Sequence, residues 1–300
     1  MGKKQQFGGK WTVEKLDILK KYIHFYTTAL KRQNFHLIYI DAFAGTGNIE
    51  LARIDDDFDY VTTEEFSPWV KNGTAYESIN GSAKIALDAP DKFDRYYFIE
   101  RNPDFAKELE ELTRAYPDLD TKIINADCNE ALVKICKEVN WSVNRAVLFL
   151  DPYASELKWK TLVEVSKTKS IDVWYLFPFS VVNRLMKKDG KISSTWRAKL
   201  TDMLGDDSWE EEFYEENTQL SLFDTGSETI RRYNEEKLKA YIVRQLETVF
   251  AKVSEKPRIL YNTKNSAMFL FCFAVSNESP TAQKLAMKAA DQILGKESGN

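Results

Sequence analysis

The segment Leu37-Ile-Tyr-Ile-Asp-Ala-Phe-Ala-Gly-Thr-Gly47 decides the fold that we expect for this chain. Its first half is an almost continuous apolar run, which is typical of a strand buried on both faces of a parallel sheet. Asp41 stands where that run stops, and Gly45 and Gly47 follow it. Glycine reaches backbone angles closed to other residues and leaves room for a ligand beside the main chain. The segment therefore predicts a cradle for a nucleotide-like cofactor.

Four more apolar runs follow, at residues 95–100, 122–127, 146–151 and 172–178. Helical patterns separate them, and strands that alternate with helices predict a parallel sheet with helices on both faces. The runs 258–261 and 268–275 are joined by a short link, which permits an antiparallel pair. Before the first strand, a helix of about 18 residues carries one apolar stripe that we expect to face the core. The residues of this stripe are Val13, Leu16, Leu19, Tyr22, Ile23, Tyr26 and Leu30.

Length and composition exclude several classes of protein. The chain has 300 residues, 43% of them hydrophobic, which predicts a single α/β domain over residues 1–300 with insertions. The net charge of -4 gives no global attraction to nucleic acid but is compatible with a local basic patch. No apolar run approaches the roughly 20 residues that span a membrane, so we expect a cytoplasmic protein with no membrane partner. The three cysteines are expected to be buried free thiols, and no His/Cys cluster predicts a metal site.

The spacing from the glycine turn to Glu100 indicates an insertion. An acid about 20 residues past the glycine loop binds the ribose hydroxyls in dinucleotide-type folds. Glu100 lies too far from Gly47 but only 19 positions after Gly81, where a helix begins. We therefore interpret residues 48–80 as an insertion or lid, and Glu100 as the ribose-binding carboxylate.

Asp127 ends the third strand and admits two interpretations. With the Cys128 amide, its carboxylate would meet the adenine edge of a nucleotide. Alternatively, Asp127 caps the helix that follows, because aspartate is a preferred N-cap residue. Both interpretations are open together.

The order of strands resembles that of the class I S-adenosylmethionine-dependent methyltransferases, which have a Rossmann-like, seven-stranded, mostly parallel sheet. In that family the seventh strand runs antiparallel between the fifth and sixth. The resemblance implies S-adenosylmethionine as the cofactor, with the Asp-x-Phe-x-Gly-x-Gly loop at its methionine part. Its implied cofactor-binding residues are Asp41, Phe43, Gly45, Gly47, Gly81, Ser82, Glu100, Asp127 and Cys128.

Several short motifs together resemble the three-Cys-motif partner protein family. They are Trp11-Thr-x-Glu-Lys-Leu16, Asp41-Ala-Phe-Ala-Gly-Thr-Gly47, Gly81-Ser-Ala83, Phe98-Ile-Glu-Arg-Asn102, Leu150-Asp-Pro-Tyr153 and Leu176-Phe-Pro178. Members of that family have a methyltransferase-like fold and are named for their association with a cysteine-motif protein. The resemblance implies such a protein as a partner, and it implies fold and cofactor better than substrate.

The fourth strand ends in Asp151-Pro152-Tyr153, which resembles the Asp-Pro-Pro-Tyr motif of methyltransferases that act on base amines. The lone pair of an exocyclic amine is delocalised into the ring. Asp151 and the Pro152 carbonyl would accept its two N–H groups and direct the lone pair at the methyl group, while Tyr153 stacks on the base. The motif departs from the family pattern, because one proline is missing and Ala154 follows Tyr153.

These residues make a SAM-dependent N-methyltransferase of nucleic acid the leading hypothesis. Phe177 and Pro178 end the fifth strand at the same edge, and Lys187 and Lys188 open a basic stretch that suits phosphates. Residues 179–250 form a mostly helical insertion, with a long helix expected around 228–250. The alternatives are a methyltransferase of a protein or small molecule and a non-catalytic, SAM-binding partner subunit. The Asp-x-Phe loop and the terminal strand pair argue against a nicotinamide dehydrogenase.

Overall fold

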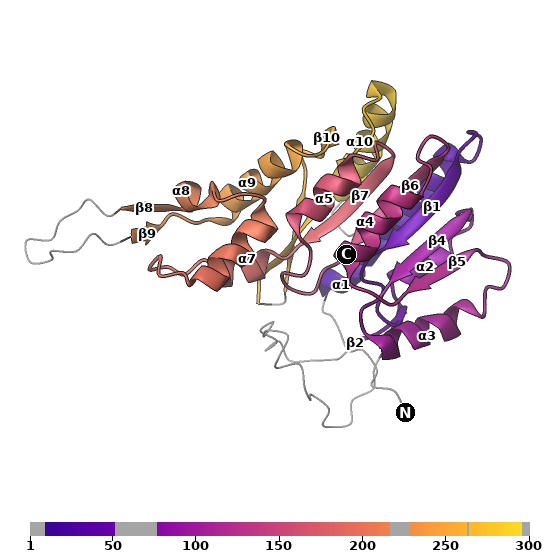
Figure 1. The fold of residues 1–300 in the computed structure, drawn as a ribbon, viewed down its shortest axis with the longest axis horizontal. Coiled ribbons are helices and arrows are strands. Elements are labelled where there is room, and N and C mark those ends of the chain that lie inside the picture. Colours follow the sequence, from indigo (N-terminus) through magenta and orange to yellow (C-terminus); the bar gives the residue numbers. More distant parts are fainter. Residues whose placement is uncertain (1–9, 52–76, 217–228, 263, 296–300) are drawn as a thin grey trace, which may run out of the picture.

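A central sheet organises the computed structural model, which describes residues 10–51, 77–216, 229–262 and 264–295 (Figure 1). Its strands follow the order β10-β12-β7-β6-β1-β4-β5, and β11 also pairs with β12. The strands are β1 (His36–Asp41), β4 (Arg95–Ile99), β5 (Thr121–Ile124), β6 (Asn144–Leu150), β7 (Ile171–Phe177), β10 (Lys252–Val253), β11 (Arg258–Tyr261) and β12 (Ala267–Val275). Each of the five expected parallel strands is present within a few residues of its predicted bounds.

One reversed strand distinguishes this sheet from the ordinary dinucleotide-binding sheet. Strands β5, β4, β1, β6 and β7 are parallel to one another, whereas β12 runs antiparallel to β7. Both β10 and β11 pair antiparallel with β12. Because β7 occupies one side of β12, β10 and β11 are successive pieces of a single strand position on the other side. The sheet thus has seven positions with the reversed strand next to last, which confirms the predicted class I methyltransferase-like fold.

Helices cover both faces of the sheet and make a three-layer structure. Helices α4, α5, α6, α7, α8 and α9 pack on one face, and α1, α2, α3 and α10 pack on the other. Their bounds are α1 (Lys10–Leu30), α2 (Ser82–Leu87), α3 (Pro103–Thr113), α4 (Cys128–Glu138), α5 (Trp159–Ser166), α6 (Phe179–Leu185), α7 (Ser194–Leu204), α8 (Trp209–Phe213), α9 (Glu235–Glu247) and α10 (Pro280–Leu294).

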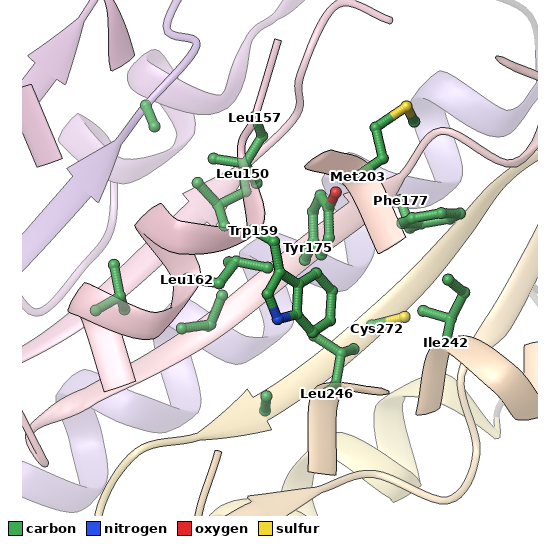
Figure 2. Packing of buried hydrophobic residues seen from close by; sticks show 14 of the residues in the cluster. Leu150, Leu157, Trp159, Leu162, Tyr175, Phe177, Met203, Ile242, Leu246 and Cys272 are labelled. Atoms are coloured by element: carbon green, nitrogen blue, oxygen red, sulfur yellow. The ribbon is translucent and has the colours of Figure 1, made fainter. Parts of the chain in front are cut away.

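Alternation along the strands supplies both cores. In β12, Leu270 and Cys272 join the α4–α9 core, whereas Phe271 and Phe273 join the α1–α10 core. This is the period of two that a strand imposes on its side chains. Figure 2 shows part of the first core, where Cys272 lies with Trp159 of α5 and with Ile242 and Leu246 of α9.

The two described ends of the segment 48–80 are paired with each other. Strands β2 (Asn48–Leu51) and β3 (Glu77–Asn80) form an antiparallel ribbon in which Asn48 faces Asn80. The Gly81 amide donates to the Gly47 carbonyl at 3.0 Å. The glycine turn and α2 are therefore joined directly across the base of the segment. Most of the lid that the sequence predicts falls on residues 52–76, outside the described residues.

The region 179–250 contains α6 to α9 and a small ribbon of β8 (Tyr214–Glu216) and β9 (Thr229–Arg231), which projects away from the main sheet in Figure 1. The predicted long helix around 228–250 is wrong at its start, because α9 begins only at Glu235. The Asn234 side chain caps it by accepting from the Lys237 amide at 2.7 Å. Of the apolar residues expected at the start of this helix, Ile230 lies in β9 and Tyr233 lies in the short link between β9 and α9.

Among the described residues, no helix is long and apolar enough to cross a membrane. Within the same ranges, no cluster of three or more His, Cys, Asp or Glu side chains is arranged to hold a metal ion. All three cysteines are free thiols; Cys128 and Cys272 are buried, while Cys136 is half-buried.

Candidate functional site

The carboxyl ends of three neighbouring strands bring three acids to one edge of the sheet. Asp41, the last residue of β1, stands in register with Phe98 of β4 on one side and with Phe149 of β6 on the other. Glu100 and Asp151 follow those two residues by two positions each, so they flank Asp41. In open α/β sheets, ligands bind at this edge, outside the carboxyl ends of the strands.

The turn after β1 needs both of its glycines. Gly45 has φ +58° and Gly47 has φ +77°, both in the left-handed region that favours glycine. A Cβ on Gly47 would also lie 2.4 Å from Leu112 Cδ2 and 3.7 Å from Ala83 Cβ. The turn therefore packs closely against α2 and α3, and its backbone is held next to Asp41.

We expect the substitution Gly47→Ala to lower the free energy of unfolding by about 1–3 kcal/mol, the usual cost of a non-glycine residue in the left-handed region. Leu112 is able to swing away from the new methyl group, but the positive φ remains. Chemical denaturation measures the loss. Gly190→Ala, at a half-buried glycine with φ +67°, is the matched control for backbone strain alone. Equal losses in the two variants would show that packing against Leu112 contributes nothing.

Glu100 is 5% exposed and braces the glycine turn. Its Oε2 accepts from the Gly45 amide at 2.9 Å, and its Oε1 accepts from the Asn102 amide at 2.7 Å. Burial raises the pKa of this carboxyl, and these amide hydrogen bonds oppose the rise. A carboxylate has about four acceptor positions, so capacity for further donors remains.

Asp41 has no exposed surface. It accepts hydrogen bonds from the Ser82 hydroxyl and from the Phe43 amide, the latter at 3.3 Å. Burial raises the pKa of Asp41 to about 7, with a further rise from Asp151, while the Ser82 and Phe43 bonds and the Lys15 ammonium oppose it. A buried carboxyl at this place is costly for the fold, which is typical of functional sites.

Asp127 caps α4, as one of its two interpretations predicted. Its Oδ1 accepts from the Asn129 amide at 2.9 Å. A third carboxyl, that of Glu156, lies close to Asp127 and Glu100. Burial raises the pKa of Glu156 to about 7; Arg101, 3.8 Å away, lowers it, and Glu100 and Asp127 raise it. Three carboxyl groups therefore lie close together in the part of the site that is expected to meet adenine. The contacts of the Asp127 carboxylate and the Cys128 amide with adenine stay predictions.

Asn129 anchors the loop that follows Asp151, a role that sequence reasoning missed. Its Nδ2 donates to Asp127 Oδ1 at 3.1 Å and to the Glu156 carbonyl at 2.9 Å. Its Oδ1 accepts from the Lys158 amide at 2.9 Å and from the Thr161 hydroxyl at 2.7 Å. One buried amide thus joins α4, the loop and the start of α5. An Asn two residues after a capping Asp is a weak sequence signal for such a role.

We expect the substitution Asn129→Ala to reduce the free energy of unfolding by roughly 3 kcal/mol, because it strands several buried partners at once. Urea denaturation measures this loss. The matched control is Asn140→Ala, which removes an exposed side chain bonded only locally, to Ser142. If the two variants lose the same stability, the loop is not anchored by Asn129.

The Asp151-Pro152-Tyr153 motif lies at the carboxyl end of β6. Pro152 is buried, and the Tyr153 ring meets the Phe43 ring edge-on, with centroids 6.4 Å apart. Ala154 has φ +55°, an uncommon left-handed conformation for a non-glycine residue. The chain therefore turns sharply after Tyr153, where this sequence differs from the Asp-Pro-Pro-Tyr motif that it resembles.

Lys15 of α1 pairs with Asp151, and this contact was not predicted. Its ammonium donates to Asp151 Oδ2, and Lys15 is only 5% exposed. The expected apolar stripe of α1 is wrong in part, because Val13 is 50% exposed. The residues on the buried face include Thr12, Lys15, Leu19, Tyr22 and Tyr26. Their spacing of three and four was the available signal, since it places a lysine on the core-facing side of a helix.

The predicted substrate residues lie in different surroundings. Phe177 has no exposed surface and packs in the core (Figure 2), so it reaches a substrate only if neighbouring side chains move. Pro178 is buried and precedes α6. Lys187 and Lys188 are exposed beyond α6, with Lys187 Nζ 5.1 Å from the centroid of the Trp196 ring. Both lysines are available to a large ligand.

No protein-family model matches the chain, and no curated protein sequence matches it. Among solved structures, a DUF519 protein from Legionella pneumophila is similar, with 12% identity over 93% of this chain and 92% of that chain, at a TM-score of 0.47. The N-terminal domain of EvdMO1, solved with SAH and D-fucose, has 9% identity over 86% and 82% of the two chains, at 0.39. An S-adenosylmethionine-dependent methyltransferase from Clostridium acetobutylicum has 11% identity over 86% and 92%, at 0.32. The fold assignment rests on the strand order of this chain itself.

Proposed function

We propose that this protein is a SAM-dependent methyltransferase that methylates an exocyclic amine of a nucleic-acid base. One observation carries the proposal: β1, β4 and β6 place the glycine turn, the buried Asp41, Glu100 and Asp151 together at the carboxyl edge of a sheet with the reversed strand β12. The family-level assignment, a three-Cys-motif partner protein, remains part of this proposal through its sequence motifs.

The residues at this edge suit the parts of S-adenosylmethionine. Glu100 retains acceptor positions for two ribose hydroxyls, and Asp41, when ionised, suits an ammonium group. Gly45 and Gly47 bring the main chain close enough for a ligand to lie against it. When bound, S-adenosylmethionine would supply an electrophilic methyl group: an amine lone pair would attack the methyl carbon in line as the C–S bond breaks, and the electron pair of that bond would leave with sulfur as the neutral thioether. The chain's own contribution is positioning and electrostatics.

The acceptor would lie at Asp151-Pro152-Tyr153. Lys15 occupies Asp151 Oδ2, and among the described residues nothing donates to Oδ1, which leaves it for an amine N–H. The Tyr153 ring is half-buried beside Phe43 and suits stacking on a base that has left its helix. Lys187 and Lys188 are exposed, which suits contacts with phosphates.

Two measurements test this function. Calorimetry is expected to show binding of S-adenosylmethionine and not of NAD; tighter binding of NAD would overturn the cofactor. Transfer of tritiated methyl groups into fractionated tRNA, rRNA, DNA and protein tests the acceptor, with Asp151→Asn as the inactive control. Label in the nucleic-acid fractions supports the proposal, whereas label confined to protein or small molecules contradicts the base amine.

The phosphate contacts have their own test. The double substitution Lys187→Glu/Lys188→Glu is expected to raise the KM for nucleic acid about tenfold or more, because two phosphate contacts become repulsions. The control is Lys284→Glu/Lys288→Glu, which makes the same charge change at exposed positions of α10, on the opposite face. An equal rise of the KM in the two double variants would exclude a specific phosphate-binding site at Lys187 and Lys188.

A second candidate is a SAM-binding partner subunit without transfer activity. The pairing of Lys15 with Asp151 favours it, because the carboxylate is already neutralised by the chain itself. Under this candidate, calorimetry shows SAM binding while no fraction becomes labelled in the absence of a cysteine-motif partner protein.

A further inference from the structure

Lys15 is a buried cation placed by α1 against the edge of the sheet that carries the site. Its side chain is 6% exposed, whereas that of Asp151 is 23% exposed. Removing an ammonium group from water is unfavourable, because the charge loses its hydration. A lysine at a core-facing helix position is therefore retained only where a charge partner and a fixed geometry compensate.

The surroundings of Lys15 fix where its ammonium lies. Lys15 Nζ is 4.9 Å from the centroid of the Trp11 ring, one turn earlier on α1. Trp11 is itself 7% exposed and packs on Phe269 of β12, with ring centroids 4.8 Å apart. The aromatic face attracts the cation and the sheet holds the ring, so the ammonium is directed to Asp151 Oδ2.

Asp41 and Asp151 would repel each other if both were ionised without a cation. The groups that act on Asp41 are Tyr39 on β1, the Phe43 amide in the glycine turn, Ser82 on α2, Asp151 after β6 and Lys15 on α1. Lys15 supplies the one positive charge among these groups. Because Lys15 contacts Asp151, and Asp151 flanks Asp41 at the end of the neighbouring strand, the ammonium is placed to compensate both carboxylates.

We propose that Lys15 is a positioning residue of the methyl-transfer site, which holds Asp151 through Oδ2 and serves as the shared counter-ion of Asp41 and Asp151. This inference rests on the proposed function. Held in this way, Asp151 keeps Oδ1 free for the acceptor amine. The nitrogen that has gained a methyl group then releases one proton to Oδ1, its N–H electron pair returning to nitrogen, and Asp151 passes that proton to water.

The first test uses S-adenosylhomocysteine binding, which requires no turnover. Calorimetry across pH 5.5–9 is applied to the wild type and to Lys15→Met, which keeps the length of the side chain and removes its charge. The ligand's ammonium group requires Asp41 to be ionised. Asp41 has a pKa of about 7, which Lys15 lowers, so loss of the lysine charge in Lys15→Met is expected to raise that pKa. Lys15→Met is therefore expected to bind S-adenosylhomocysteine only at higher pH than the wild type. A shift of one pH unit corresponds to about tenfold weaker binding near neutrality. Lys20→Met, an exposed lysine on the same helix, is the matched control.

Two further variants keep the test decisive if Lys15→Met folds poorly. Asp151→Asn removes the repulsion, so its binding midpoint is expected below that of the wild type. Lys15→Met/Asp151→Asn removes both charges, so its midpoint is expected to return toward the wild-type value. With a merely structural role for Lys15, Lys15→Met would keep the wild-type midpoint and Lys15→Met/Asp151→Asn would keep that of Asp151→Asn, and such a result would overturn the proposal.

The last readout is transfer itself. Lys15→Met is expected to lower kcat about 100-fold, the scale of a lost positioning and proton-transfer contribution, with little change in KM for the acceptor. Lys15→Arg is expected to recover part of this loss because it restores the charge. Wild-type protein that binds SAH but transfers no methyl group would count against the proposed function, while the pH shift would still support the counter-ion role. Full activity of Lys15→Met would overturn the positioning role alone.

Discussion

Replacement of Asp41 by asparagine is expected to abolish S-adenosylmethionine binding and, at pH 8, to stabilise the ligand-free protein. Asp41 has no exposed surface, and burial raises its pKa to about 7. In the unfolded chain an aspartate titrates near its ordinary pKa of about 3.9. Between these two values the folded protein binds more protons than the unfolded chain. Its stability therefore falls as pH rises from about 4 to about 7, and the full cost is present above pH 7.

The size of this effect is on the order of 4 kcal/mol at most, since each unit of pKa difference corresponds to about 1.4 kcal/mol. Asparagine cannot ionise, so Asp41→Asn is expected to remove most of this cost at pH 8 and little of it at pH 4. Urea denaturation at both pH values measures the difference. The control Asp118→Asn changes an exposed aspartate and is expected to leave stability unchanged. Loss of stability at pH 8 in Asp41→Asn would contradict the assignment of a buried carboxylate.

The second large effect concerns Asp151. The substitution Asp151→Ala leaves the Lys15 ammonium buried without its partner. Breaking a fully buried pair typically lowers the free energy of unfolding by about 3–5 kcal/mol. We expect a loss of about 3 kcal/mol for this variant, because Asp151 is partly exposed and water screens the pair. It is also expected to reduce methyl transfer by about 100- to 1,000-fold, the usual effect of losing one electrostatic group at a reacting centre. Loss of activity in this variant is therefore ambiguous by itself.

A double-mutant cycle separates the two causes. Lys15→Met/Asp151→Ala removes both charges and is expected to recover most of the lost stability while remaining inactive. Urea denaturation, SAM calorimetry and methyl transfer are measured for all four proteins. If the two single substitutions prove additive in stability, the Lys15–Asp151 pair contributes nothing to the fold. If the double variant regains activity together with stability, Asp151 has no role beyond pairing with Lys15.

Local signals in the chain were sufficient for the parallel strands and for the glycine turn. Buried strands are near-continuous apolar runs, and a turn at positive φ favours glycine. The segment Leu37–Gly47 therefore predicts a buried strand and a glycine turn without reference to the rest of the chain. The meeting of the acids at the strand ends was also predictable from the sequence, because the carboxyl ends of parallel strands lie at one edge of the sheet. The helix expected at 228–250 was wrong at its start, because its apolar residues are spaced as in a helix and the spacing alone does not reveal that a strand precedes the Asn234 cap.

The sequence by itself determined the parallel strands, the antiparallel pair near the end of the chain and the acid that follows each of three strands, since each of these features depends on residues close to each other in the chain. The order of the strands in the sheet was expected only from the resemblance to class I methyltransferases, and the parallel arrangement then brings Asp41, Glu100 and Asp151 to one edge. Only the tertiary structure decided which side chains join them. Lys15 lies 136 positions from Asp151, and their contact depends on how α1 packs against the sheet. Contacts of this kind carry no periodicity that a single sequence displays, because the free energy of pairing two buried charges arises only once both have left water.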